Sequence, residues 1–559
     1  MNKGNKGQNN KQQDKMQIEN KTYKYDLINL CVTVPFLVLI AACGVLLVLY
    51  STSKYGSAIT HDSVAYIYAA ESILSGKGMQ YFGYDSPLVQ WPPLFPLILA
   101  GMKSAGVNLI FASAHFNGII YALVILISGL WILKNTRNGI FAIIGSLALL
   151  ASIPLYYVSR FIWSETLFIF FTLLFFISMD NYIEKTYTKV PLQKKTSEEP
   201  STEKSSIKFL ILASIFAALA CLTRYIGITV VITGAMVLLI QKKKVFNRLL
   251  EIVLFGAISS VPTVIWVVRN YLLTGTLTGG RFPSQNGINE NIELFFKTIS
   301  LWIAPTYSEN MAYLIIGIFI FIAIIIILIC KINLTSQVSI SASNNVNANN
   351  NVNKIIILLI FSIIYSVYLL LSASTVSFDS INNRLLSPIY IALILLMLFT
   401  IAAFIDIASK GKVNMILITI LAALLFSSWI VYPLSEIRDD ANYSYENGAG
   451  ILSSKWWEQS PLIEYVRELP SDFVICSNCP DAVYIHSGKI SRYPPKKEGL
   501  HWYGIRQFEK IVEENENVYI IWFDVDVGES IYNIQELQEY FRIEVIDKLY
   551  DGIIYSVHQ

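Results

Sequence analysis

Charged side chains are scarce in this chain of 559 residues, where Asp, Glu, Lys and Arg make up 15% and hydrophobic residues 54%. Soluble domains carry about 25% charged residues. The apolar residues gather in long runs, and about 20 apolar residues in a row are enough for a helix to cross a bilayer. The composition therefore excludes an ordinary soluble protein and predicts a mainly α-helical, polytopic membrane protein.

Cysteine is also scarce, and six cysteines in the whole chain are too few for a disulfide scaffold. Four of them lie in apolar runs, where cysteine behaves as a small buried hydrophobe. Cys476 and Cys479 form the motif CSNC in a polar region. One CxxC lacks the second ligand pair of a zinc ribbon. A local disulfide and two thiols are both better interpretations than a metal site.

Histidine occurs only five times, and no HExxH motif is present. The sequence also lacks a P-loop, a Rossmann glycine pattern and a G-x-S-x-G motif. These absences remove the support for a zinc protease, a nucleotide-binding enzyme or an α/β-hydrolase. No residue is assigned as a metal ligand and no cofactor is expected with certainty, although a divalent metal stays possible.

Eleven apolar runs are candidates for membrane spans. The first run is too long for a signal-peptide core of about 7–15 residues, and no A-x-A-like site follows it, so it is interpreted as an uncleaved anchor. Several other runs are short, and any count from ten to thirteen is compatible with the sequence. The runs lie near residues 27–50, 110–133, 139–158, 163–183, 207–222, 225–241, 249–268, 312–330, 355–373, 385–405 and 413–432.

The distribution of Lys and Arg predicts the orientation, because these residues are enriched in cytoplasmic loops. The polar segment 1–26 is rich in lysine, and with eleven spans every loop on the same side as this segment carries Lys or Arg. We therefore expect a cytoplasmic tail (1–26), a transmembrane domain (27–432) and an extracytoplasmic domain (433–559). The cell membrane is the expected location.

The C-terminal part, residues 433–559, has 22 acidic and 11 basic side chains. An excess of negative charge argues against nucleic-acid binding. Strand-like runs such as DFVIC and VYIIWF alternate with helix-like runs, which predicts a small soluble α/β domain.

Polar residues are concentrated in the loop that follows the first span. The loop opens with His61 and Asp62, and residues 63–75 then have helical spacing. Residues 93–104 are apolar but too short to span. Two helices that lie at the outer membrane surface fit this pattern. Asp62 could cap the helix that begins at Ser63, or it could act chemically, and the sequence leaves both roles open.

Notable charges lie at the ends of the spans, whereas transporters place ionisable groups near the middle of the membrane. Glu165 could pair with Arg160, and arginines at helix ends can simply reach lipid headgroups. These charged residues nevertheless lie on one side of the membrane, which favours chemistry on a substrate with its lipid tail in the bilayer. Under the predicted topology the outer face is reached by Asp62, Arg160, Glu165, Arg224, Arg269 and Arg384.

Two motifs carry a family resemblance: H-D-S-x-x-Y at residues 61–66 and W-P-P-L-x-P at residues 91–96. With several smaller matches, they resemble the C-type membrane glycosyltransferases, and within these the protein O-mannosyltransferase and lipid A aminoarabinose transferase group. The resemblance covers roughly residues 27–405. The smaller matches are SRFIWSETLF (159–168), LTRYIG (222–227), RNYLLTGTLTGG (269–280) and NNRLLSPIY (382–390).

The resemblance implies transfer of a sugar from a polyprenyl-phosphate donor to an acceptor hydroxyl at the outer membrane face. It implies that Asp62 is the general base and that Glu165 is a second acidic residue of the site. His61, Tyr66 and Trp91 lie in the matched motifs and are expected to bind substrate. Relatives often have Glu-Lys before the two prolines where this chain has Gln90-Trp91. This difference removes a lysine that could contact the phosphate and a carboxylate that could contact a metal.

The expected chemistry needs a base and a cation. A carboxylate that takes the acceptor's proton contributes about 10²–10⁴-fold in rate, and arginine can hold the leaving phosphate through two hydrogen bonds. Arg384 is the first candidate for this contact, followed by Arg269 and Arg224. One-step displacement predicts inversion. The acceptor could be a glycan, a lipid or a protein, and the sugar a hexose or a pentose.

Two alternatives stay open. A transporter or flippase of lipid-linked sugars would need an inverted repeat and helices broken near mid-membrane, and the sequence shows neither clearly. A non-catalytic scaffold that displays the acidic C-terminal domain is the third interpretation.

The predicted orientation can be tested by labelling. In a cysteine-free background, a cysteine placed near residue 440 should react with a membrane-impermeant maleimide on intact cells, because that region is expected outside. A cysteine near residue 195 should react only after the cells are opened. Labelling of both positions on intact cells would contradict the orientation.

Overall fold

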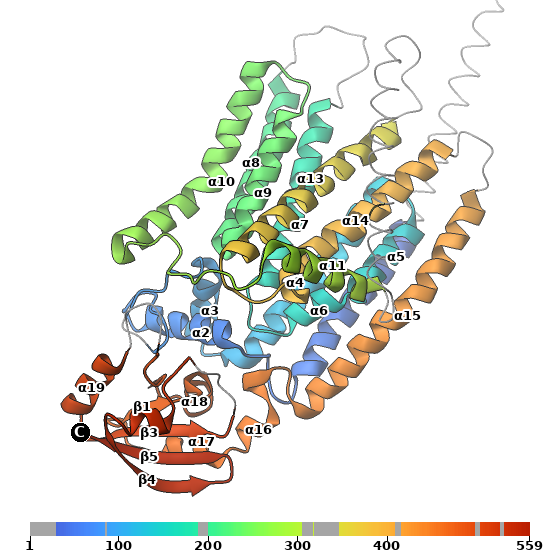
Figure 1. Cartoon of the computed structure of the whole chain (residues 1–559). Helices are drawn as coiled ribbons and strands as arrows, with labels where there is room; N and C mark the ends of the chain where they lie inside the picture. Colours follow the sequence, from blue (N-terminus) through green and yellow to red (C-terminus); the bar gives the residue numbers. More distant parts are fainter. Residues whose placement is uncertain are drawn as a thin grey trace, which may run out of the picture.

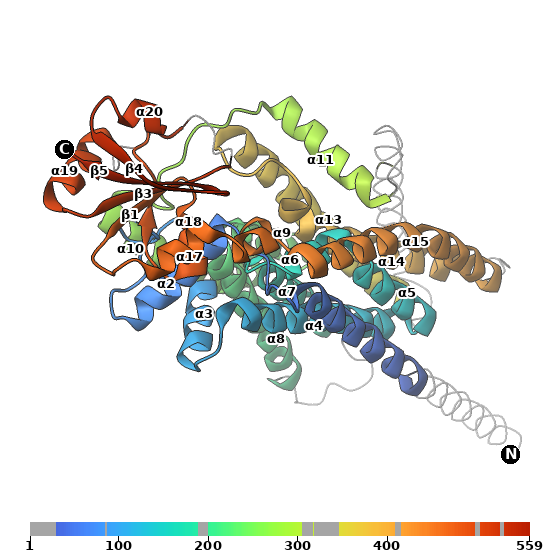
Figure 2. The ribbon, with the colours of Figure 1, turned by 90° about the horizontal axis from the view of Figure 1, so that it is seen from below.

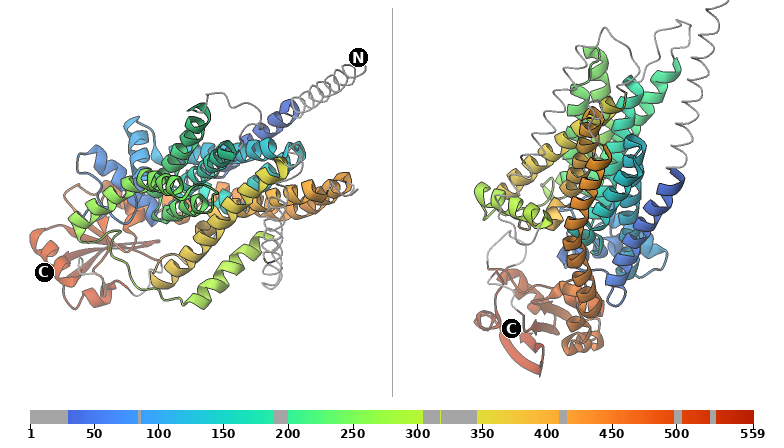
Figure 3. Two further views of the ribbon diagram at one scale, coloured as in Figure 1. Left: turned by 90° about the horizontal axis from the view of Figure 1, so that it is seen from above. Right: turned by 90° about the vertical axis from the view of Figure 1, so that its right-hand side faces the viewer.

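The computed structural model describes residues 30–83, 86–187, 200–303, 317, 346–408, 415–497, 504–525 and 530–559. These residues form a long helix bundle with a small α/β unit at one end (Figure 1). Views from below, from above and from the side show the same arrangement (Figures 2 and 3). The predicted helix bundle with a C-terminal α/β unit is confirmed.

The bundle begins with the helix Leu30–Thr52. Its other helices are α2 (His61–Leu74), α3 (Leu94–Ser104), α4 (Leu109–Thr136), α5 (Gly139–Leu150), α6 (Ile153–Ser159), α7 (Glu165–Tyr187), α8 (Pro200–Thr223), the 3₁₀ turn η1 (Tyr225–Gly227), α9 (Ile228–Leu239), α10 (Val245–Thr274), α11 (Ile288–Ile303), α13 (Val346–Thr375), α14 (Asn383–Ala408) and α15 (Met415–Asn447).

Seven helices of the described chain are long and apolar enough to cross a membrane, or eight if the bent pair α5–α6 is one span. The protein is thus an integral membrane protein. Of the eleven predicted spans, 312–330 lies outside the described residues except for residue 317, and 413–432 falls at the start of α15, which is described from residue 415. The run 225–241 folds as η1 and the 12-residue α9, and this pair belongs to the shorter apolar helices.

Local chemistry explains the two breaks. Ser152 caps α6 by accepting from the Leu155 amide, and Pro154 occupies the first turn of that helix, so the chain restarts there with a bend of 55°. Between α8 and α9, Arg224 is extended and Gly227 packs on the preceding helix. A Cβ atom at Gly227 would lie 2.6 Å from the Cys221 backbone, so only glycine permits this tight turn.

The predicted surface helices at 63–75 and 93–104 correspond to α2 and α3. Both lie between the bundle and the α/β unit (Figure 1). Helix α3 buries Phe95 and Leu99, and both side chains belong to a core that also includes Val64 of α2 and Leu462 of the C-terminal unit. The loop after the first span is therefore a packed layer that joins the two parts of the molecule.

The C-terminal unit follows α15, which continues past the predicted boundary at residue 432. It contains η2 (Ile451–Ser453), α16 (Lys455–Glu458), α17 (Pro461–Glu468), β1 (Val474–Ser477), α18 (Pro480–Ser487), β2 (Ser491–Arg492), α19 (Ile505–Glu514), β3 (Val518–Phe523), α20 (Ile534–Leu537), β4 (Arg542–Leu549) and β5 (Gly552–His558).

The strand order is β2-β1-β3-β5-β4, with β2, β1 and β3 parallel and β5 antiparallel to both of its neighbours. The buried faces of β1 and β3 carry Ile475, Ile521 and Phe523, which pack on α17 and α18. Cys476 is buried, Cys479 is half-buried, and both are thiols.

A buried ion pair joins three helices far from the α/β unit. Lys354 of α13 contacts Asp180 of α7 at 3.1 Å, both side chains are 2% exposed, and Trp131 of α4 donates to the same carboxylate at 3.0 Å. Lys354 lies inside α13, although a lysine at the end of an apolar run can also belong to a loop. Asp180 is 15 residues along α7 from Glu165, or about 22 Å.

We expect Lys354→Met to lower the free energy of unfolding by about 3–5 kcal/mol, because it leaves a buried carboxylate without its cation. The double variant Asp180→Asn/Lys354→Met should recover part of this loss. Lys134→Met is the matched control, since the 52% exposed Lys134 contacts Glu184 nearby and should contribute less than about 1 kcal/mol. Unfolding in detergent provides the measurement. Equal effects of the two single substitutions would contradict the structural role of the pair.

Candidate active site

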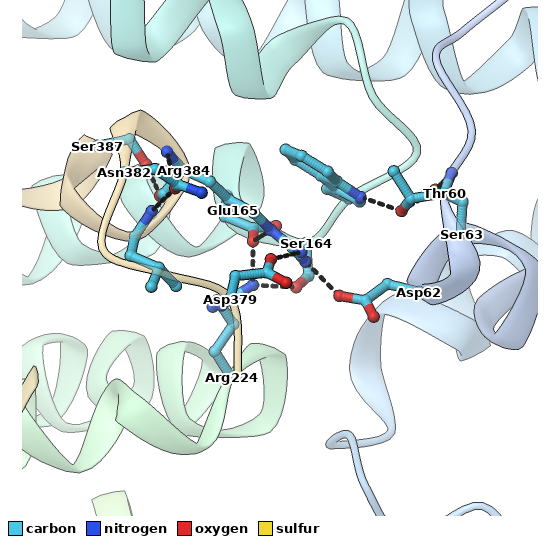
Figure 4. Close-up of polar contacts among 12 residues, drawn as sticks. Thr60, Asp62, Ser63, Ser164, Glu165, Arg224, Asp379, Asn382, Arg384 and Ser387 are labelled. Carbon is cyan, nitrogen blue, oxygen red and sulfur yellow. Dashed lines mark hydrogen bonds and ion pairs between the residues drawn. The ribbon is translucent and has the colours of Figure 1, made fainter. Parts of the chain in front are cut away.

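One guanidinium group lies at the centre of the predicted site. Arg384 is the second residue of α14 and is 7% exposed, and each of its three nitrogens meets a different carboxylate (Figure 4). The Nη2 atom donates to Asp62, Nε donates to Glu165 Oε1 at 2.5 Å, and Nη1 donates to Asp379 Oδ2 at 2.9 Å. The structure therefore brings together three residues that the sequence predicted separately, and it adds Asp379.

Glu165 is shared by two arginines. It is the first residue of α7 and is 1% exposed, and Arg224 also donates to its Oε1 atom at 2.5 Å. The extended backbone at the α8–α9 turn directs Arg224 into the site, where it also contacts Ser164 at 3.3 Å. Pairing of Glu165 with Arg160 is wrong as an interpretation, because Arg160 contacts Asp440 at 2.5 Å instead.

Asp62 is the second residue of α2 and is not its cap. Thr60 occupies the N-cap position, and its amide donates to the Ser63 hydroxyl oxygen at 3.1 Å. The interpretation of Asp62 as an N-cap is therefore wrong, and its carboxylate is available to Arg384. Trp163 donates to the Thr60 hydroxyl at 2.8 Å. The Arg384 guanidinium lies over the Trp163 ring, with its carbon 3.9 Å from the ring centroid.

The charges around Asp62 lower its basicity in this state. Burial opposes ionisation of the carboxyl, but the charge of Arg384 and its hydrogen bond outweigh burial, and His61 and Arg224 add to this effect. The pKa of Asp62 therefore lies below its usual value. Asp62 is ionised near neutral pH, but a carboxylate held by a guanidinium is a weak proton acceptor.

His61 contacts the C-terminal unit. Its Nδ1 atom donates to Asp481 Oδ2 at 2.8 Å, and its Nε2 atom lies 2.8 Å from the Tyr81 hydroxyl. No motif in the sequence indicated this contact between residues 420 positions apart.

Aromatic rings connect His61 to the other predicted substrate residues. The ring of Tyr81 stacks on Trp91 at a centroid distance of 6.2 Å, and Tyr66 meets Trp91 edge-on at 5.7 Å. Tyr66 is 1% exposed, and its hydroxyl lies 3.3 Å from Ser164. Tyr66 therefore packs against the ring of Trp91, and the half-buried Trp91 is more accessible to a ligand than the buried Tyr66.

Arg269 does not join the carboxylate cluster. It contacts the backbone just before Trp91 and lies over the Trp266 ring at 4.5 Å. Tyr225 and Arg281, which the sequence did not single out, act in the same way. Three successive carbonyls are held by these side chains: Leu88 by Arg269 (3.2 Å), Val89 by Tyr225 (2.9 Å) and Gln90 by Arg281 (3.1 Å).

A close approach of two loops explains one glycine of the matched motifs. Gly279 has φ +83°, and a Cβ atom there would lie 2.9 Å from Gln90 Cγ. The motifs around Tyr225, Arg269 and Gly279 thus share one task, which is to fix the loop that precedes Trp91.

The described residues contain no group of three or more His, Cys, Asp or Glu side chains that could hold a metal ion. The three carboxylates around Arg384 surround a guanidinium instead. The site therefore does not fit a divalent metal, and no step below uses one.

Comparison with solved structures shows that the fold of this chain is a known one. ArnT from Cupriavidus metallidurans superposes with a TM-score of 0.57 in the apo state and 0.58 in the structure bound to undecaprenyl phosphate. The two alignments cover 93% of this chain and 98% of ArnT, at 11% and 12% identity. The chain shares the fold of ArnT, a C-type membrane glycosyltransferase. The family resemblance is thereby confirmed at the level of the fold.

Other comparisons add less. The archaeal oligosaccharyltransferase AglB from Archaeoglobus fulgidus, in complex with an inhibitory peptide and a dolichol-phosphate, aligns over 87% of this chain and 69% of AglB. Its TM-score of 0.45 at 11% identity is too low to support an argument. No protein-family model and no curated protein matches the sequence.

We expect Arg384→Lys to destabilise the protein by about 3–5 kcal/mol, because one ammonium cannot reach three carboxylates and leaves buried charge without a partner. Arg438→Lys is the matched control, since Arg438 is 70% exposed and contacts only its neighbour Asp439 among the described carboxylates. Thermal unfolding of both variants in detergent gives the comparison. Equal melting temperatures would show that the Arg384 cluster does not hold the site together.

Proposed function

We propose that the protein transfers a sugar from a polyprenyl-phosphate donor to an acceptor hydroxyl, with Asp62 as the general base. The observation that supports this function best is the contact of Asp62 with Arg384 at the junction of α2 and α14. It provides a base and a phosphate-binding cation side by side. The fold adds support, since an ArnT structure with this fold is bound to undecaprenyl phosphate.

The donor phosphate must displace a carboxylate to reach Arg384. Asp379 is the weakest competitor, because its side chain is 55% exposed and its contact of 2.9 Å is longer than the 2.5 Å contact of Glu165. The cluster contains three carboxylates and two guanidinium groups, so its net charge is −1 when all are ionised. A phosphate that replaces Asp379 keeps the cation compensated, whereas one added to the intact cluster is repelled.

Donor binding also activates the base. A phosphate on Arg384 neutralises the charge that lowers the pKa of Asp62, so this pKa rises when the donor arrives. Asp62 can then take the proton of the acceptor hydroxyl as this oxygen attacks the anomeric carbon. The carbon–oxygen bond to the phosphate breaks in the same step, and Arg384 stabilises the charge on the leaving phosphate. Glu165 holds both arginines in place.

The step inverts the anomeric centre, because the attacking and leaving oxygens lie on opposite faces. The sugar is a hexose or a pentose, and the acceptor is a glycan, a lipid or a protein. The reaction takes place at the outer face of the cell membrane, with the N-terminus in the cytoplasm and the C-terminal unit outside. A transporter is less well supported, because the charges of this cluster lie at helix ends.

The test is Asp62→Asn, assayed with a panel of polyprenyl-phosphate hexoses and pentoses and with cell membranes as the acceptor source. Asparagine preserves the shape of the side chain and removes the base. We expect turnover to fall about 10²–10⁴-fold, while binding of undecaprenyl phosphate by the purified variant is retained.

Asp439→Asn is the control, because Asp439 is 66% exposed and lies outside the cluster. It should keep wild-type turnover. An Asp62→Asn protein that is folded and as active as the wild type would rule out Asp62 as the base. Absence of transfer by the wild type with every donor would contradict the proposed function itself.

A further inference from the structure

The C-terminal unit reaches the active site through one side chain. Asp481 is the second residue of α18 and is 6% exposed, and its Oδ2 atom accepts from His61 Nδ1 at 2.8 Å. Its other oxygen is buried and has no hydrogen-bond partner among the described residues. A buried carboxylate needs a cation or donors, so His61 is the group that compensates Asp481.

His61 is next to Asp62 in the first turn of α2. A side chain that is fixed at both ring nitrogens restrains this turn, because Asp481 holds Nδ1 and Tyr81 holds Nε2. The direction in which Asp62 projects towards Arg384 depends on the same turn.

A second contact attaches the same two helices. The Tyr484 hydroxyl, on α18, donates to Glu71 of α2, and its ring packs edge-on against Tyr68 at a centroid distance of 5.8 Å. Phe82, in the loop after α2, meets the ring of Tyr484 at 4.8 Å. These contacts of Tyr484 hold α18 against α2 and do not involve Asp481. Substitution of Asp481 should therefore change the first turn of α2 while the C-terminal unit stays docked on the bundle.

We propose that Asp481 is a positioning residue of the active site, which acts through His61 to hold Asp62 in the orientation that the reaction needs. The inference rests on the proposed function and extends it. The soluble unit thus becomes part of the catalytic machinery, although Asp481 itself lies behind His61 and touches neither the sugar nor the phosphate.

The contact makes activity depend on the charge of His61. The His61 side chain is 43% exposed, and its partial burial opposes protonation of the ring, but Asp481, and to a lesser extent Asp62, outweigh it, while Lys496 acts in the opposite direction. The pKa of His61 is therefore raised. A raised pKa means that the ion pair is fully formed below the ordinary pKa of histidine and is lost as the pH rises through the pKa in the folded protein. Protonated His61 donates to both Asp481 and Tyr81. The neutral ring can still donate to Asp481 and accept from the Tyr81 hydroxyl, so deprotonation removes the charge that strengthens the contact with Asp481.

The experiment compares pH profiles of turnover for the wild type and Asp481→Asn. We expect wild-type activity to fall on the alkaline side as His61 loses its proton. Asp481→Asn should move this decline to lower pH by about one unit and should reduce turnover on the order of tenfold, which corresponds to one charge-assisted hydrogen bond. Asp481→Glu should restore part of both effects. In a His61→Asn background, Asp481→Asn should have little further effect.

Asp472→Asn, at an exposed position of the same unit, is the control and should keep the wild-type profile. Wild-type turnover in Asp481→Asn would overturn the inference. Reduced turnover in Asp481→Asn with an alkaline decline at the wild-type pH would also overturn it, because a purely structural role of Asp481 lowers activity without changing the pH dependence. Both outcomes require an active wild type, so they are distinct from failure of the proposed function, in which the wild type transfers no sugar.

Discussion

The site depends on the compensation of one buried cation. Arg384 is 7% exposed, and a buried guanidinium is tolerated only when its charge is paired and its N–H groups have acceptors. Three carboxylates meet this requirement, and they come from α2, from the start of α7 and from the turn before α14. The start of each helix is thereby fixed relative to the others, although Asp62 and Arg384 are 322 residues apart in sequence.

Other features surround this ion cluster and limit its movement. Trp163 covers the face of the Arg384 guanidinium, and Arg224 gives Glu165 a second cation. A separate set of contacts fixes the backbone before Trp91, and α18 holds α2 from the opposite side. The result is a preorganised but inhibited arrangement. In the proposed mechanism Asp62 is the base, and it gains basicity only when a substrate anion binds Arg384 in place of Asp379.

Much of this could be predicted from the sequence. The apolar runs identify most of the spans, and the polar residues at their ends place Asp62, Glu165, Arg224 and Arg384 on one surface. The partner of each charged residue could not be predicted, because a charge at a helix end has several possible partners and the periodicity of the sequence does not distinguish them. Asp379 precedes Arg384 by only five residues, so its charge was the available signal. Asp481 had no such signal, since its contact with His61 depends on how two separate units dock.

A structure with bound undecaprenyl phosphate tests the central claim most directly. If the account is right, a phosphate oxygen lies within hydrogen-bond distance of Arg384, Asp379 has moved away, and the contact between Asp62 and Arg384 is loosened so that the carboxylate faces the acceptor side. A phosphate bound elsewhere, with Arg384 still held by all three carboxylates, would contradict it.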